Sequence, residues 1–550
     1  MKREPERLLE RTFDVVVVGG GIHGACAAME AARRGLSVAL LERGDFGSAT
    51  SHNSLKLLHG GFRYIQHLDF RRIRQSIRER RYWLAAAPHM CRPLAFLMPL
   101  RGVGTRSRGA LYGALKLYEL IAADRNRGVP AERAIPAGRI VGKHELYSLA
   151  PSLRPGYTSG AIWYDGQMLD ADRLLLSCVA AAVESGAVAM NYAAVEGLSL
   201  TRDNAVAGVK VRDRLRGEEL DVRAKQVIFA AGPWNAALLK TAGIASWRQQ
   251  AAQVKSMNVV VPALFERDDL AVGIESKRRS DSVVGNTNRL FFVTPWQGLS
   301  VIGTTHEPFD GEPEACTFGR SEVEAFLGEF NDAYCGRPVD LDDVVYVYGG
   351  LTPAVEGRIA LGRSRHAVVT DHSATDGVAG LWSVAGVKFT TARYVAEIAV
   401  AAVAARAGLD SPARVPTTAL PGGEDFPGED VLIERLRRST DLDGALLGQL
   451  VRAYGTRVEH VLEAGGYVPG SGEEGVLACR MRYAIREEMA VCIDDLLHRR
   501  THLAMTGKAD TKSRELAAAL LAEEGGDASC LDIDARAFDS ASSASAELVS

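Results

Sequence analysis

The chain has 550 residues, of which 47% are hydrophobic and 24% are charged, so we expect about two or three domains with sizeable cores. Its net charge of -3 argues against a nucleic-acid partner, which requires a dominant basic face. Residues 1–11 are charged, and no apolar run is long enough to cross a bilayer, so we expect neither a signal peptide nor a transmembrane helix. The 8 cysteines show neither CxxC pairs nor metal-ligand spacing with histidine, which predicts reduced thiols in a cytoplasmic protein and no metal site.

The first segment has the pattern of a dinucleotide-binding unit. A hydrophobic strand, a Gly-rich turn, a helix of small residues and a second strand are expected at residues 13–18, 19–24, 25–34 and 36–41. Gly19 permits the tight turn, Gly21 lets the backbone approach a pyrophosphate, and Gly24 lets the helix pack closely on the strand. The pyrophosphate would bind at the helix N-terminus, and Glu42 would accept hydrogen bonds from ribose hydroxyls. The pattern predicts a Rossmann-like domain without distinguishing FAD from NAD.

A glycine pair follows a polar loop. Gly60 and Gly61, next to Arg63 and Tyr64, suggest backbone in close contact with a bound ring system and side chains that face a pocket.

Two basic segments come next, Arg71–Arg81 and Arg101–Arg127, and the second also has an apolar face. Such a face can lie on an anionic membrane surface or pack on the protein core. The sequence leaves both interpretations open.

From residue 160 onward the pattern predicts mainly short strands. Alternating residues near Val195, at 207–211 and at Val222 predict a small antiparallel layer. Residues 225–234 read as a buried strand with a sharp Gly-Pro exit, which suits a returning strand of the nucleotide domain. Residues 250–350 are again strand-rich, and we expect them to form a sheet that covers the cofactor and contacts the substrate.

These patterns, together with the family resemblance given next, predict an α/β fold: a Rossmann-like FAD-binding domain, an antiparallel-sheet substrate (cap) domain and a C-terminal all-helical domain. The expected divisions are an N-terminal extension (1–12), a discontinuous FAD-binding domain (13–90, 160–245 and 355–410) and a basic amphipathic insertion (91–159). The cap (246–354), the C-terminal helical domain (415–525) and a disordered tail (526–550) complete the chain.

The sequence resembles the FAD-dependent, respiratory glycerol-3-phosphate dehydrogenases over roughly residues 12–505. Separate motifs in the same order carry the resemblance: Thr50–Tyr64, Glu79–His89, Gly232–Trp234, Pro295–Trp296 with Ile302–Thr305, Lys388–Arg393 and Tyr483–Thr501. The resemblance implies FAD, oxidation of a secondary alcohol by hydride transfer to the flavin, and a quinone acceptor. It also implies peripheral attachment to the inner face of the cytoplasmic membrane, and it leaves a homodimer open.

The turn and the motifs together predict the site residues. Those expected at the cofactor are Gly19, Gly21, Gly24, Glu42, Thr50, Ser51, Gly60, Gly61, Val195, Ala231, Gly232, Gly386, Lys388, Phe389 and Thr390. The expected catalytic residues are Lys388, Arg63 and Tyr64. A helix that begins at Phe389 would direct its free N–H groups toward the flavin and stabilise its anionic reduced form.

Departures from the family pattern concern the substrate. The residues expected at the substrate are Asn258, Thr352 and Thr391. Thr352 stands where relatives carry an arginine, Asn258 replaces a histidine, and a further arginine expected near residues 369–371 is missing. An arginine contact with phosphate stabilises binding by about 1.5–3 kcal/mol.

The departures leave the substrate open. One alternative is that Arg358, Arg363 or Arg365 compensates for the missing arginines. Another is a substrate other than glycerol 3-phosphate, namely an unphosphorylated hydroxy acid, a polyol or an amine. A third alternative is a flavin-binding sensor without turnover.

Overall fold

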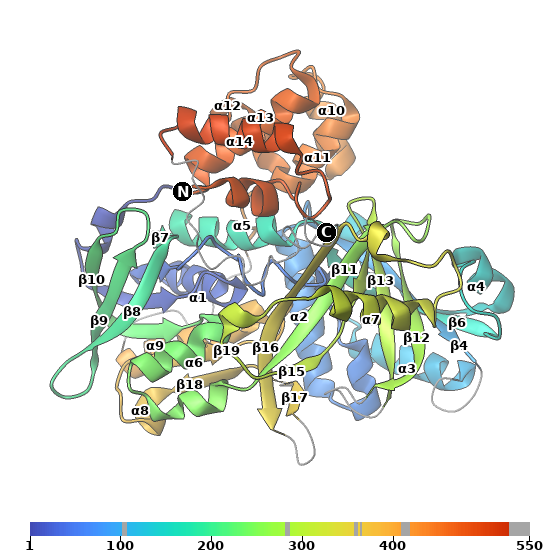
Figure 1. Cartoon of the computed structure of the whole chain (residues 1–550), viewed down its shortest axis with the longest axis horizontal. Helices are drawn as coiled ribbons and strands as arrows, with labels where there is room; N and C mark the ends of the chain where they lie inside the picture. Colours follow the sequence, from blue (N-terminus) through green and yellow to red (C-terminus); the bar gives the residue numbers. More distant parts are fainter. Residues whose placement is uncertain (102–106, 281–286, 357–360, 364–365, 409–417, 527–550) are drawn as a thin grey trace.

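Two β-sheets and a C-terminal group of helices make up the chain (Figure 1). The computed structural model describes residues 1–101, 107–280, 287–356, 361–363, 366–408 and 418–526. The α/β class and the three kinds of domain expected from the sequence are confirmed. Within the described ranges, no helix is both long and apolar enough to cross a membrane.

The first sheet is the nucleotide-binding sheet. Its strands are β1 (Phe13–Val18), β2 (Val38–Leu41), β7 (Val188–Met190), β8 (Ala193–Leu200), β9 (Val206–Asp213), β10 (Glu219–Phe229), β18 (Val368–Asp371) and β19 (Leu381–Ala385). The order is β18-β19-β10-β1-β2-β7, and β1, β2, β7, β10 and β19 run parallel. The other end of β10 pairs with β9 in the antiparallel layer expected from the sequence. Strand β10 is therefore the returning strand that residues 225–234 predicted.

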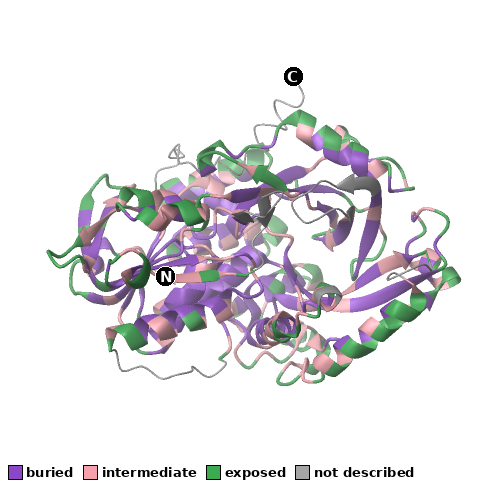
Figure 2. Ribbon diagram, turned by 90° about the horizontal axis from the view of Figure 1, so that it is seen from below, coloured by how far each residue is buried: buried purple, intermediate pink, exposed green. Residues whose placement is uncertain are grey.

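Strand β1 shows why this sheet is buried on both faces. Its side chains point alternately to the two faces of the sheet, since Val15 and Val17 belong to one hydrophobic cluster, whereas Val16 and Val18 belong to another. The first cluster is closed by helices α1 (Ile22–Arg33), α5 (Ala171–Glu184) and α9 (Ala392–Ala407). A continuous hydrophobic run is typical of a parallel strand covered on both sides. Figure 2 shows most of the central strands buried, with exposed residues on the outer faces of the helices.

The second sheet faces the nucleotide-binding domain and belongs to the cap domain. Its strands are β3 (Leu57–Leu58), β4 (Cys91–Leu100), β5 (Arg139–Gly142), β6 (Ser159–Met168), β11 (Gln253–Pro262), β12 (Leu270–Ser280), β13 (Thr287–Trp296), β14 (Leu299–Gly303), β15 (Glu307–Phe309), β16 (Tyr346–Glu356) and β17 (Leu361–Arg363). The order is β17-β16-β11-β14-β13-β12-β4-β6-β3, with β15 beside β11 and β5 beside β6.

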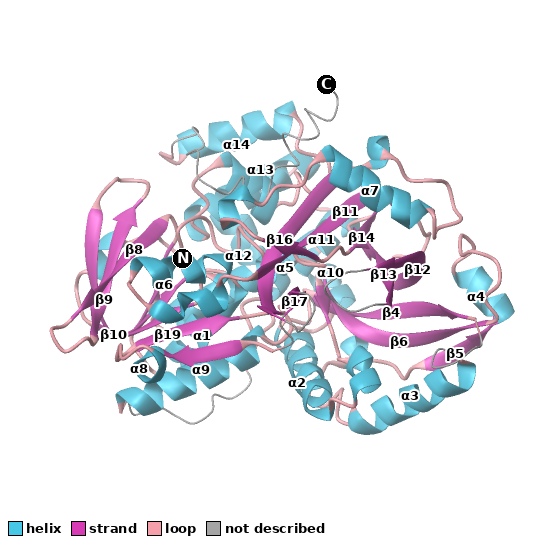
Figure 3. Cartoon of the chain, turned by 60° about the horizontal axis from the view of Figure 1, so that its bottom comes forward, coloured by secondary structure: helices cyan, strands magenta, loops and turns pink. Residues whose placement is uncertain are grey.

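Helices cover both faces of the second sheet. Adjacent residues of β13 point to opposite sides, since Phe291 packs with one cluster and Phe292 with another. The Phe291 side is covered by α4 (Lys143–Leu149) and α7 (Arg320–Asn331). The Phe292 side is covered by α2 (Phe70–Ala86) and α3 (Arg108–Ile121), which lie together at the edge of the molecule (Figure 3).

The C-terminal domain is helical and lies above α5 in Figure 1. Its helices are α10 (Glu429–Leu436), α11 (Gly444–Tyr454), α12 (Val458–Ala464), α13 (Gly472–Glu487), the π-helix η10 (Asp495–Arg500) and α14 (Thr511–Glu523). The π-helix packs on α5 and so joins this domain to the nucleotide-binding domain.

The structure differs from the sequence prediction at two places. Residues 91–100 and 159–168 form β4 and β6, which pair in the second sheet, although the expected division gave them to the insertion and the FAD-binding domain. Helix α9 begins at Ala392, three residues after the expected Phe389, because a turn with Thr390 comes first. The tail expected to be disordered lies, from residue 527 on, outside the described residues.

Candidate functional site

A cavity of about 930 Å³ lies between the two sheets. One end is lined by the Gly19–Gly24 turn, Glu42 and the start of β8, and the other by strands of the cap. Ligand sites of this kind are typically formed between domains, and this volume is at the upper end of their usual range. The cavity can therefore take an extended molecule of dinucleotide size.

The Gly-rich turn is packed as a dinucleotide site requires. A Cβ at Gly24 would lie 1.8 Å from the Gly19 carbonyl oxygen, so only glycine lets α1 approach the end of β1 this closely. Gly19 has a φ of +105°, a region that other residues avoid. The Ile22 N–H at the start of α1 donates to Ser51 Oγ at 2.9 Å. The helix N-terminus thus faces the cavity, where it favours an anionic group.

Glu42 ends β2 and lines the same end of the cavity. Its carboxylate accepts hydrogen bonds from the Gly20 N–H at 2.5 Å and the Gly44 N–H at 2.8 Å. Burial raises the pKa of Glu42, although these two N–H groups act in the opposite direction. A carboxylate has about four acceptor positions, so Glu42 retains capacity for the ribose hydroxyls that the sequence prediction assigned to it.

The opposite end of the cavity is polar. Ser256 and Asn258 on β11, Thr304 and His306 after β14, and Thr352 on β16 line it. Ser256 Oγ and His306 Nδ1 lie 2.8 Å apart. Asn258 Oδ1 and Thr352 Oγ1 are buried and have no hydrogen-bond partner among the described residues, so they remain available to a ligand. Within this described lining, the arginines (Arg43, Arg212 and Arg214) lie at the Glu42 end.

Lys388 projects from the turn between β19 and α9 and lines the cavity. Its Nζ donates to the Tyr64 hydroxyl and lies 4.3 Å from the centre of the Tyr64 ring. Two hydrogen bonds hold this turn, because Thr390 Oγ1 accepts from the His59 N–H and its carbonyl oxygen accepts from Trp83 Nε1. The turn is thus fixed from β3 and α2, and Lys388 is held in place.

Most of the sequence-predicted residues meet in this cavity. Those that line it are Gly19, Gly21, Glu42, Thr50, Ser51, Val195, Ala231, Gly232, Asn258, Thr352, Gly386, Lys388, Phe389 and Thr390. The others contribute from behind the wall or lie outside it: Gly24, Gly60, Gly61, Arg63, Tyr64 and Thr391.

Gly60 and Arg63, which do not line the cavity, have different surroundings. Gly60 donates its N–H to Asp165, and a Cβ there would clash with Arg80 Nη1 at 2.2 Å, which explains the glycine. Arg63 is exposed, whereas its neighbour Tyr64 contacts Lys388.

Sequence reasoning missed His23, which lines the cavity next to the Gly-rich turn. Its ring packs against Gly386, where a Cβ would lie 2.1 Å from Nε2. Burial lowers the pKa of His23 to about 4, so the imidazole is neutral at physiological pH. Its Nε2 is buried and has no partner within the described chain. The signal was present in the sequence, because His23 occupies a variable position of the Gly-x-Gly-x-x-Gly turn.

Comparisons with known proteins agree with this geometry. Residues 14–402 match the family of FAD dependent oxidoreductases, and residues 414–527 match the C-terminal domain of alpha-glycerophosphate oxidase. The chain is 30% identical over 512 residues to the aerobic glycerol-3-phosphate dehydrogenase of Escherichia coli K12, covering 92% of this chain and 96% of that protein. The chain belongs to the FAD-dependent glycerol-3-phosphate dehydrogenase family.

Two further relatives extend the comparison. A glycerol-3-phosphate dehydrogenase of Synechocystis is 29% identical over 526 residues, covering 92% of this chain and 91% of that protein. The X-ray structure of a glycerol-3-phosphate dehydrogenase from Bacillus halodurans, complexed with FAD, has a TM-score of 0.73 at 24% identity. It covers 94% of this chain and 92% of that one, which establishes the shared fold.

The residues present fit FAD, the cofactor of this family. The turn and Glu42 provide a pyrophosphate and ribose site, and the cavity continues past His23 and Gly386 to Lys388. The buried, unpaired Nε2 of His23 is the kind of polar atom that a bound ligand satisfies.

We expect His23→Leu to weaken FAD binding about tenfold, because the variant removes a neutral polar contact from the cavity wall. Fluorescence titration of the apoprotein with FAD measures this change. His144→Leu, which alters an exposed histidine on α4, serves as the control and should leave the dissociation constant unchanged. Equal affinities for wild type and His23→Leu would show that His23 does not contact the cofactor.

Proposed function

We propose that the protein oxidises sn-glycerol 3-phosphate to dihydroxyacetone phosphate with FAD and passes the electrons to a quinone. The observation that carries the proposal is that the dinucleotide turn and Lys388 line the same cavity. The relatives named as glycerol-3-phosphate dehydrogenases support the substrate, since they match 92% of the chain.

The proposed mechanism assigns distinct tasks to the side chains near the turn. When bound, FAD supplies the two-electron acceptor for the hydride on the substrate's secondary carbon. The ammonium group of Lys388 lies at the cavity wall, where it binds the substrate hydroxyl and by its charge favours transfer of the hydroxyl proton to solvent water. Tyr64 accepts a hydrogen bond from Lys388 and so fixes the direction of its Nζ. Arg72 packs 4.0 Å from the Tyr64 ring and restricts that ring in turn.

The remainder of the substrate would occupy the polar end of the cavity. Asn258 and Thr352 offer neutral hydrogen-bonding groups there, and His306 supplies an imidazole. The proposed compensating residues Arg358 and Arg365 lie outside the described residues, as does the side chain of Arg363.

A second candidate function follows from the same polar end. Neutral groups at Asn258 and Thr352 suit hydroxyl or amine substrates as well as a phosphate ester. A dehydrogenase for an unphosphorylated hydroxy acid, polyol or amine is therefore the alternative that the substrate test must separate.

We expect purified holoenzyme to bleach under anaerobic conditions with sn-glycerol 3-phosphate but not with glycerol. Lys388→Met should retain its FAD and reduce it about 100-fold more slowly, because the positioned charge is lost. Stopped-flow absorbance follows the flavin, and Lys240→Met, on the exposed side of α6 (Asn235–Thr241), is the control. Bleaching only by unphosphorylated alcohols or amines would favour the second candidate. No bleaching by any substrate of a broad panel would indicate a sensor.

Restoring the family's arginine tests the substrate end separately. We expect Thr352→Arg to lower the KM for glycerol 3-phosphate about tenfold or more, because a charge-assisted contact with the phosphate is added. Steady-state kinetics with a dye acceptor provide the measurement. Thr241→Arg places the same charge in the cavity wall at the α6 side and should not lower the KM. An unchanged KM for Thr352→Arg would mean that the phosphate does not reach β16.

For the membrane, we propose docking through α3 and the start of α2. Arg108, Tyr112, Lys116 and Leu120 follow one another at helical i, i+4 spacing, and Leu120 is 75% exposed. Leu68 beside α2 is also exposed, at 63%. Such a basic and apolar surface suits an anionic bilayer.

The arginines of α2 contribute less to this surface than the sequence suggested, because most of them are engaged within the protein. Arg74 and Arg81 pair with Asp124, and Arg80 is buried against Asp165.

We expect the protein to co-sediment with anionic vesicles at low salt and Leu120→Asp to reduce the bound fraction several-fold, because it puts a charge into the docking face. Val431→Asp, at an exposed apolar position of α10, is the matched control and should bind like the wild type. Equal binding of both variants would exclude α3 as the docking face.

A further inference from the structure

The loop of residues 43–54 has two faces, and only one belongs to the cavity. Gly47, Thr50 and Ser51 line the cavity, whereas Asp45 and His52 are buried on the side away from it. The cavity side is bonded to both neighbouring walls: the Gly47 N–H donates to the Gly20 carbonyl at 3.1 Å, and Thr50 Oγ1 donates to the Leu351 carbonyl at 2.9 Å. A shift of this loop would therefore move the wall that holds the cofactor.

The buried side of the loop is held by the C-terminal domain through Asp45. Arg499 Nε lies 2.6 Å from Asp45 Oδ2, and Arg500 makes two hydrogen bonds to the same carboxylate at 2.8 and 2.9 Å. All three side chains are at most 1% exposed. Although burial alone would raise the pKa of Asp45, Arg500 and Arg499 lower it to about 2. Asp45 is thus a carboxylate with two guanidinium partners.

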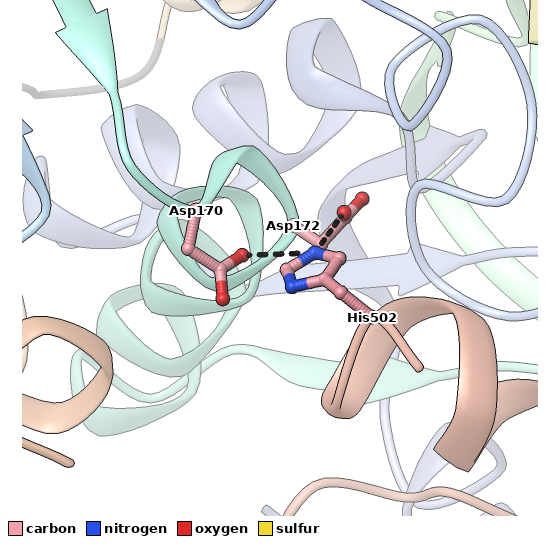
Figure 4. A group of neighbouring side chains, drawn as sticks. All are labelled: Asp170, Asp172 and His502. Atoms are coloured by element: carbon pink, nitrogen blue, oxygen red, sulfur yellow. Dashed lines mark hydrogen bonds and ion pairs between the residues drawn. The ribbon is translucent and has the colours of Figure 1, made fainter. Parts of the chain in front are cut away.

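A second link joins His52 to the same domain. His52 Nδ1 lies 3.0 Å from Asp172 Oδ1, and His502 Nε2 lies 2.9 Å from Asp172 Oδ2. Figure 4 shows His502, after the π-helix, between Asp172 and Asp170 of the α5 region. Asp170, Asp172 and His502 have the donor atoms of a cation site, but both Asp172 oxygens are already bound to imidazole groups. The arrangement is therefore a bridge from the loop through α5 to the C-terminal domain.

Burial makes these links selective for one loop conformation. A buried charge that loses its partner is left uncompensated, which is costly in the protein interior. If the loop moved, Asp45 would lose both arginines, and His52 would leave Asp172. Arg499 would keep its contact with Asp495, and Arg500 its contact with Glu488, so the uncompensated charge would be that of Asp45. Lys56 strengthens the arrangement, because its buried Nζ donates to the His52 carbonyl at 2.9 Å.

We propose that the C-terminal helical domain retains the cofactor: its Arg499, Arg500 and His502 hold the loop 43–54 in the conformation that binds FAD. These groups are positioning residues, since they act through Asp45, His52 and Asp172 and do not line the cavity. The proposal rests on FAD as the cofactor and adds a task for a domain that lies outside the site.

Thermodynamic linkage makes the proposal reciprocal. If docking of the domain favours FAD binding, FAD binding must favour docking by the same factor. The coupling can therefore be measured in two independent ways. One is the FAD affinity of variants, and the other is the protection of the C-terminal domain from hydrogen exchange in the wild type.

The first test compares variants of the full-length chain by fluorescence titration of the apoprotein with FAD. His502→Leu should raise the FAD dissociation constant about tenfold, within the usual range of coupling between sites. His502→Gln keeps an N–H donor for Asp172 and should recover most of the affinity. Residue 502 has a left-handed backbone (φ 59°), which places the same demand on leucine and on glutamine, so the difference between the two variants reports the side chain.

The control breaks another contact between the same domains. Arg457 of the C-terminal domain pairs with Glu184 of α5, away from the loop. Glu184→Gln should leave FAD affinity unchanged. If Glu184→Gln and His502→Leu weaken FAD equally, or if neither does, the proposal is wrong. Apoprotein that takes up no FAD in any form would instead overturn the cofactor itself, which keeps the two failures apart.

The second test needs no substitution and so does not depend on whether variants fold. Hydrogen exchange of residues 488–506 in the wild type should slow on addition of FAD, although these residues do not line the cavity. Residues 444–454 of α11, in the same domain, serve as the internal reference. Unchanged exchange in 488–506, with FAD bound, would overturn the proposal.

Discussion

The position of one loop, residues 43–54, determines the shape of the whole site. Ser51 of the loop accepts the first free N–H of α1, and Thr50 bonds to the cap strand β16. On the other side, Asp45 bonds to two arginines of the C-terminal domain. Nucleotide turn, cap and helical domain are thus connected through one short segment. Because the charged contacts are buried, the segment has few alternative positions of similar energy.

This connection offers a task for the C-terminal domain, whose described residues do not line the cavity. Asp45 and His52, on the back of the loop, are buried in the complete chain, where Arg499 and Arg500 of the C-terminal domain contact Asp45. The π-helix η10 supplies consecutive arginines to Asp45, and π-helical turns are often found at functional positions. In the proposed coupling, the C-terminal domain acts on the binding site through the loop, behind which its side chains lie.

The sequence predicted what is encoded locally. The Gly19–Gly24 turn was recognisable because its glycine spacing is a local pattern, although a Cβ at Gly19 would meet the distant Ala230. Strand β10 was recognisable because an apolar run ends in Gly-Pro. The placement of β4 and β6 in the second sheet was not predictable, since the sequence of a ten-residue strand does not specify its partner strand. The late start of α9 depends on contacts of Thr390 with His59 and Trp83, which are distant in sequence.

The same limit applies to the site. Asp45 and Arg500 are 455 positions apart, and nothing near either residue indicates the other. At the substrate end, by contrast, Thr352 was noticed from the sequence, and the structure gives it a physical meaning. Thr352 and Asn258 line the cavity, and the Thr352 hydroxyl and the Asn258 amide oxygen are buried without a partner among the described residues. This end therefore offers neutral hydrogen-bonding groups in place of charge. Neutral groups discriminate by hydrogen-bond geometry, whereas an arginine attracts any anion over a longer range. In the proposed mechanism, the charge of Lys388 acts on the reacting carbon, and the residues on β11 and β16 contact the rest of the substrate, so the two tasks belong to separate groups of the cavity lining. A change of substrate in this family can therefore occur at β11 and β16 while the chemistry at Lys388 is kept.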